Sequence, residues 1–145
     1  MLTKDEICRL IPHRDPFLWI DEVVEESENR LVARKFVDPG LDVFRGHYPG
    51  RPVLPGVLLC EAAMQAGAVL IARLGFPARE AAGRVPVATR INNVKFRQMV
   101  RPGDTLEIEV ELRERLADAF FLSARIQVCG KTAAQLEFAC ALASA

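Results

Sequence analysis

The sequence has no excess of charge of either sign. Its 19 lysine and arginine residues equal its 19 aspartate and glutamate residues, so the formal net charge is zero. A chain with this balance has no general attraction for nucleic acid or for an anionic membrane surface. We therefore expect neither among its partners, and any anionic partner must meet a local cluster of cations.

Cysteine and histidine are also scarce. The chain has four cysteines, none of them in a CxxC pair, and only two histidines. These are too few, and too scattered, for a zinc site, so we expect no metal and no other cofactor. Each cysteine lies in apolar sequence, where a reduced thiol packs as a small hydrophobe. The N-terminal segment lacks an apolar signal core, and together these features predict a reduced, cytoplasmic protein.

Internal repeats, low-complexity stretches and linkers are absent too. The 145 residues therefore predict a single domain, residues 1–145, around one sizeable core. Thr3 and Glu6 indicate a capping box that opens a short helix. The remaining expected elements are strands at residues 18–25, 30–37, 85–96, 105–115, 120–128 and 132–142, a long helix at 57–74 and a helical turn at 78–83. This order favours an α+β fold with an antiparallel sheet wrapped around one central helix.

The expected long helix is apolar on every face, which is typical of a buried helix. Its apolar run before Arg73 is shorter than a membrane span requires. Glu61 and Gln65 are the only polar side chains before Arg73, and their spacing places them on one face. An unpaired buried carboxylate is costly. Glu61 is therefore either a structural residue with a buried partner or a functional residue.

The segment before this helix reads GHYPGRPVLPG, and its three prolines make it stiff. It carries His47 toward the helix, and a histidine in a rigid loop beside an isolated carboxylate is a candidate acid–base group. Backbone N–H groups at Gly56 and Val57, at the start of the helix, are suited to stabilising an oxyanion. With Gln65 as a further substrate-binding residue, this set suits removal of water from a 3-hydroxyacyl thioester.

Three segments carry a more specific signal: LIPHRDPFLWIDEV (residues 10–23), GHYPGRPVLPGVLLCEAAMQ (46–65) and VKFRQMVRPGD (94–104). They resemble the β-hydroxyacyl-acyl carrier protein dehydratases of type II fatty acid synthesis (FabZ-type), over nearly the whole chain. The resemblance implies the hot-dog fold, a curled antiparallel sheet around one long helix. It also implies a homodimer, alone or within a trimer of dimers. Each site would combine His47 of one subunit as base, Glu61 of the other as acid, and the Gly56 N–H on the thioester oxygen.

The implied substrate is a (3R)-hydroxyacyl-acyl carrier protein and the implied product is its trans-2-enoyl form. Lys95, Arg97 and Arg101 form a basic run, which is either a solvated strand face or a dock for the acidic carrier protein and its phosphopantetheine. The family usually has glycine where Arg90 stands. Acyl-chain length, and the choice between carrier protein and CoA thioester, therefore stay open.

Two other functions are compatible with the same fold: an acyl-CoA hydratase or thioesterase, and a non-catalytic protein that binds an acyl ligand. The joint presence of His47 and Glu61 favours the dehydratase, because binding alone needs no acid–base pair. Glutamate rather than aspartate at position 61 favours a plain dehydratase over the isomerising sister family. We expect Cys60 to be structural, and His13 to bond backbone at the turn between helix and strand.

Overall fold

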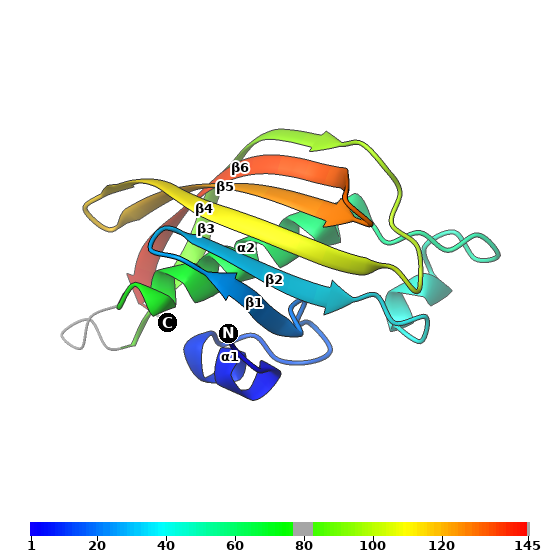
Figure 1. Ribbon diagram of the computed structural model, residues 1–145, viewed down its shortest axis with the longest axis horizontal. Helices are drawn as coiled ribbons and strands as arrows, with labels where there is room; N and C mark the ends of the chain where they lie inside the picture. The colour runs from blue at the N-terminus through cyan, green and yellow to red at the C-terminus, as the bar shows by residue number, and fades with distance from the viewer. Residues whose placement is uncertain (77–82, 145) are drawn as a thin grey trace.

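The computed structural model describes residues 1–76 and 83–144 (Figure 1). Apart from Gly83, the expected helical turn at 78–83 lies outside these residues. The other expected elements are present, and the capping box of Thr3 and Glu6 opens the first helix. In chain order the elements are α1 (Lys4–Leu10), β1 (Glu22–Glu26), β2 (Arg30–Phe36), the 3-10 helix η1 (Asp42–Arg45), α2 (Gly56–Arg73), β3 (Arg84–Phe96), β4 (Thr105–Leu116), β5 (Ala119–Val128) and β6 (Lys131–Ser144).

The first strand begins four residues later than the sequence pattern predicts, at Glu22 rather than at residue 18. The Trp19 N–H donates to Oε1 of Gln65 on α2, at 2.7 Å, and so does not join a strand ladder. Leu18 and Ile20 are buried all the same. The apolar run that resembled a strand is therefore a segment that lies against α2 and is hydrogen-bonded to the Gln65 side chain.

Six strands form one antiparallel sheet in the order β1-β2-β4-β5-β6-β3. Alternation along β4 separates its two faces, as the sequence predicted: Leu106, Ile108 and Val110 are fully buried, while the glutamates between them keep exposed surface. The sheet curls around α2, with α1 beside its β1 end (Figure 1). This arrangement confirms the α+β hot-dog fold.

The central helix α2 is buried along most of its length, which is possible because small residues let the sheet approach it. At Gly67 an added Cβ would lie 2.8 Å from Cζ of Phe138 on β6, closer than atoms can pack. By length and hydropathy alone α2 is a candidate membrane span, but 61% of the candidate segment is buried inside the fold. Such burial is typical of the core helix of a folded domain.

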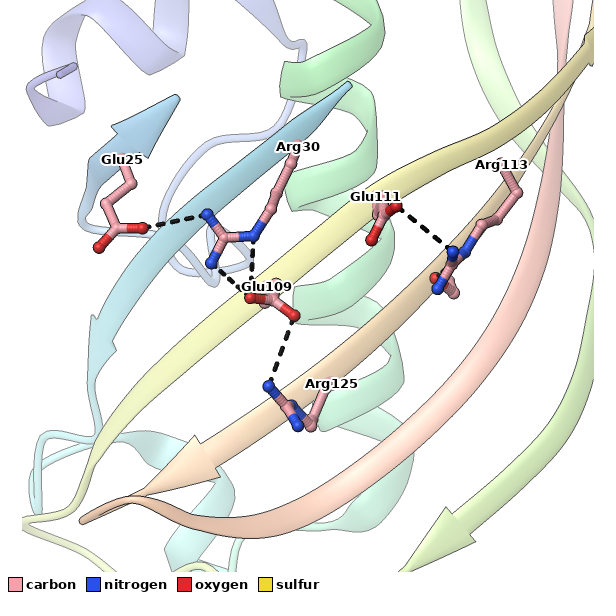
Figure 2. A network of polar contacts seen from close by, with 7 residues as sticks. Glu25, Arg30, Glu109, Glu111, Arg113 and Arg125 are labelled. Atoms are coloured by element: carbon pink, nitrogen blue, oxygen red, sulfur yellow. Dashed lines mark hydrogen bonds and ion pairs between the residues drawn. The ribbon is translucent and has the colours of Figure 1, made fainter. Parts of the chain in front are cut away.

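The outer face of the sheet carries charges that neutralise one another (Figure 2). Arg30 contacts Glu25, at 3.1 Å, and Glu109, at 3.0 Å from its Nε. Arg125 approaches the other carboxylate oxygen of Glu109, and Arg113 lies beside Glu111. Ion pairs on an exposed face contribute little stability, but they leave little net field for an anionic partner.

Candidate active site

His47 lies in the loop that joins η1 to α2, and the loop fixes its tautomer. Its Nδ1 is 2.6 Å from the carbonyl oxygen of Val53. A carbonyl oxygen only accepts, so in the neutral ring Nδ1 must carry the proton and Nε2 must carry the lone pair. The next residue, Tyr48, has φ of 56°, and its ring centroid lies 4.5 Å from that of His47. Such a backbone angle is unusual for a bulky residue and is often found at functional sites.

Glu61 lies on the second turn of α2, and its carboxyl group meets two side chains. Oε2 of Glu61 accepts a hydrogen bond from Nε2 of Gln65 at 3.0 Å and lies 3.8 Å from Nε2 of His13. The Glu61 side chain keeps 23% of its surface exposed. The sequence predicted a buried carboxylate, but in one chain this carboxylate still faces outward on one side and is available to a substrate or a partner.

Gln65 lies behind Glu61 and is completely buried. Its amide oxygen accepts from the Trp19 N–H at 2.7 Å, and its amide nitrogen donates to the Phe17 carbonyl at 2.8 Å as well as to Glu61. The side chain has no exposed surface, and both of its amide N–H groups are used by these partners. Its observed hydrogen bonds are structural and include one to Glu61, and the predicted substrate-binding role of Gln65 stays a prediction.

The N-terminus of α2 lies beside a cavity of about 520 Å³ lined by Gly56, Val57, Phe96, Arg97 and Met99, among others. The N-cap residue, Pro55, makes no side-chain cap to the first turn, which leaves the N–H groups of Gly56 and Val57 without a cap from that residue. A Cβ at Gly56 would lie 2.8 Å from Cε1 of Phe96, so only glycine fits against that ring. Uncapped N–H groups beside a cavity are suited to binding an oxyanion.

The structure does not join the two predicted catalytic residues within one chain. Among the described residues, His47 makes its polar contacts within its own loop and η1, with Val43 and Val53. Glu61 contacts His13 and Gln65 instead. His13 was expected to bond backbone, yet its Nδ1 is buried without a hydrogen-bond partner in the described part of the chain. Within one chain, the histidine beside Glu61 is therefore His13, for which the sequence predicted a structural role.

The predicted basic run divides between two places. Lys95 lines a depression on the outer face together with Glu109 and Glu137, whereas Arg97 lines the cavity at the start of α2. Arg101 lines an adjoining cavity of about 560 Å³, where Lys131 from the start of β6 joins it. Lys131 is far from the basic run in sequence, so only the β5–β6 hairpin reveals it as a member of this group.

The two buried cysteines, Cys60 and Cys140, are unsuited to nucleophilic chemistry. All four are free thiols, and burial raises the pKa of Cys60, next to Glu61. Burial raises the pKa of Cys140 further, to about 11. A thiol with a raised pKa stays protonated near neutral pH and reacts slowly. Within residues 1–76 and 83–144, no three histidine, cysteine or acidic side chains gather as they would around a metal ion.

Comparison with known proteins gives a consistent result. A family profile described as a FabA-like domain matches residues 11–137. The chain is 43% identical over 138 residues to 3-hydroxyacyl-[acyl-carrier-protein] dehydratase FabZ of Chloroflexus aggregans, covering 94% of this chain and 93% of that protein. It is 46% identical over 137 residues to the protein of the same name from Enterococcus faecalis, covering 94% of each.

Among solved structures, the chain resembles the dehydratase heterocomplex ApeI:P from Xenorhabdus doucetiae, with a TM-score of 0.81 and 18% identity, over 95% of this chain and 91% of that one. It also resembles the PaaI protein of E. coli, with a TM-score of 0.65 and 18% identity, over 82% of this chain and 80% of that one. At such identities the likeness concerns the fold alone.

Proposed function

The chain belongs to the FabA-like domain family, and from this premise we propose that it dehydrates (3R)-hydroxyacyl-acyl carrier protein to the trans-2-enoyl thioester in type II fatty acid synthesis. The proposal is carried by the match, over nearly the full length of both chains, to relatives named as FabZ dehydratases. The tautomer of His47 supports it independently, because that ring presents a proton-accepting Nε2.

The reaction follows from the residues in order. Nε2 of His47 removes a proton from C2 of the substrate, and the thioester oxygen gains the negative charge of the enolate. The N–H of Gly56, with Val57 beside it at the start of α2, stabilises that oxygen. Glu61 then donates a proton to the 3-hydroxyl group as the C3–O bond breaks, and water leaves. The site is reset when the proton held by His47 is returned to Glu61.

The proposed site uses a second copy of the chain, because no contact joins His47 to Glu61 within one copy among the residues that the structure describes. Of the two edge strands, β1 and β3, β1 is bridged by Leu2 at Val23, and the β3 edge is the surface that fits such a partner. It is a strand of 13 residues with a neighbour, β6, on one side only, and its residues from Val87 to Phe96 are exposed. Unpaired strand edges invite pairing with another chain. The exposed apolar side chains on this edge are Val87, Ile91, Val94 and Phe96.

Phe96 links this edge to the site, because its ring packs on Gly56 at the start of α2. A homodimer that pairs its β3 strands would bring the α2 N-terminus of each subunit near the interface. His47 of one subunit would then face Glu61 of the other. The assembly of such dimers into a trimer of dimers stays a prediction of the family resemblance.

The carrier protein is proposed to dock beside the same cavity. Arg97 and Arg101 line neighbouring cavities that share Gln98 and Met99, and Lys131 adds a third cation. None of the three forms an ion pair among the described residues, so their charge is available to an acidic protein and to the phosphate of its phosphopantetheine. Lys95, surrounded by glutamates on the outer face, is the weakest candidate of the predicted dock.

The test is an assay of the purified protein with 3-hydroxyacyl thioesters of several chain lengths, on carrier protein and on CoA. We expect formation of the enoyl thioester on carrier protein, with no free thiol released, in a cytoplasmic enzyme. Release of free thiol would identify a thioesterase instead. Turnover of the CoA thioester alone would identify an acyl-CoA hydratase, and ligand binding without turnover would identify a non-catalytic protein.

A further inference from the structure

Oε2 of Glu61 has two nitrogen neighbours, and only one of them is within hydrogen-bonding distance. Gln65 donates to this oxygen at 3.0 Å and is held by its other bonds to the segment at 17–19. Nε2 of His13 is 3.8 Å from the same oxygen, which is longer than a hydrogen bond. A movement of about 1 Å would make it one.

The surroundings of His13 fix how its ring can be protonated. The backbone of the loop is held by Arg14, whose guanidinium bonds the carbonyl oxygens of Ile11, at 2.8 Å, and of His13, at 2.7 Å. Nδ1 of His13 is buried and has no hydrogen-bond partner within residues 1–76 and 83–144. A buried N–H without an acceptor is rarer and more costly than an unused lone pair. In a neutral ring the proton is therefore on Nε2, the nitrogen that faces Glu61.

Burial and two neighbouring charged residues determine whether His13 is protonated. Burial lowers the pKa of His13 most strongly, Glu61 acts in the opposite direction, and the cation of Arg14 lowers it further. The result is a pKa below the ordinary value, so the ring is neutral at pH 7 and is an N–H donor rather than a cation. A neutral donor orients a carboxyl group without holding it as a salt bridge.

We propose that His13 is a positioning residue for Glu61: with Gln65 it donates to Oε2, so that Oε1 is the oxygen that carries and delivers the proton. The inference rests on the proposed function, in which Glu61 is the acid. Two donors on one oxygen disfavour a proton there, because each needs a lone pair of that oxygen. The segment at 10–17 thus serves the site through its histidine.

The ring can be observed directly, because the chain has only two histidines. In the His47→Ala variant, ¹⁵N-histidine NMR reports His13 alone. We expect the neutral form with its proton on Nε2 at pH 7, and a lower His13 pKa after Glu61→Gln removes the carboxylate that raises it. A proton on Nδ1, or a titration unchanged by Glu61→Gln, overturns the proposal. The NMR experiment does not depend on enzyme activity. It therefore tests the contact between His13 and Glu61 separately from the role of Glu61 as the acid.

Kinetics of two variants supply the second arm. His13→Phe keeps a ring but removes the donor, and His13→Gln places an amide N–H near the position of Nε2. We expect kcat to fall roughly ten- to a hundredfold in His13→Phe, with KM nearly unchanged, and most of the loss to be restored in His13→Gln. A folded His13→Phe variant with the kcat of the wild type overturns the proposal, as does an equal loss in both variants. If His13→Phe does not fold, the NMR arm decides.

Discussion

At the scale of the residue, the bond between Nδ1 of His47 and the Val53 carbonyl decides what His47 can do. It leaves Nε2 as a proton acceptor held in a stiff loop. His47→Ala should lower kcat by roughly two to four orders of magnitude, the usual contribution of a general base. The fold should survive, since one hydrogen bond is worth about 1 kcal/mol. Steady-state kinetics beside a denaturant unfolding curve checks both parts, and turnover close to that of the wild type would remove His47 from the mechanism.

Cysteine reactivity tests the burial of the core at the same scale. Burial raises the pKa of Cys140 to about 11 and also raises that of Cys60, so both thiols stay protonated at pH 8. Cys129 is exposed at the β5–β6 turn. A thiol reagent at pH 8 should modify Cys129 rapidly, and Cys140 and Cys60 only after unfolding. Cys129→Ser is the control that should remove the fast labelling of this thiol and leave only that of half-exposed Cys8. Rapid labelling of Cys140 in the folded protein would contradict the described packing.

Single residues were the least predictable part of the site. The spacing of Glu61 and Gln65 showed that they share a helix face, and the loop motif identified His47. The approach of His13 to Glu61 joins residues far apart in the chain, so no local pattern contains it. The same holds for the bond between Gln65 and Trp19, which also explains why the first strand begins late.

At the scale of the element, α2 depends on a glycine in its interior. In a helix interior, glycine to alanine ordinarily gains up to about 1 kcal/mol. At position 67 the new methyl group would lie 2.8 Å from the Phe138 ring, so Gly67→Ala should instead destabilise the protein by about 1–3 kcal/mol. Gly46→Ala is the matched control, because nothing lies within 4 Å of its Cβ position. Thermal unfolding of both variants tests this, and a Gly67→Ala variant as stable as the wild type would refute the close approach.

The β3 edge gives a second prediction for an element. Ile91→Asp places a charge among the exposed apolar residues of this edge and should weaken a dimer by about thirtyfold or more if Ile91 lies at its centre. The control is Leu116→Asp, at the far end of β4, where an apolar side chain is comparably exposed. Sedimentation should show monomers for the first variant and dimers for the second. Dimers of equal strength in both variants would place the interface elsewhere.

At the scale of the whole molecule, the fold followed from the sequence more completely than the site did. Alternation in β4 and the uniformly apolar α2 each specify burial directly, and a single buried helix leaves few ways to arrange an antiparallel sheet. The motif of residues 46–65 indicated the chemistry. The sequence did not predict all the cations of the proposed carrier-protein dock. Lys131 is far from Arg101 in the chain, and the β5–β6 hairpin brings the two together.

The proposed active site spans two copies of the molecule, with His47 from one chain and Glu61 from the other. His47→Ala and Glu61→Gln homodimers should each be nearly inactive. After subunit exchange, half of the dimers are hybrids with one intact site each, so dehydration of a 3-hydroxyacyl-carrier protein should recover to roughly a quarter of the wild-type rate. Exchange is verified with differently tagged chains, and a mixture that exchanges subunits yet stays inactive would contradict the shared site.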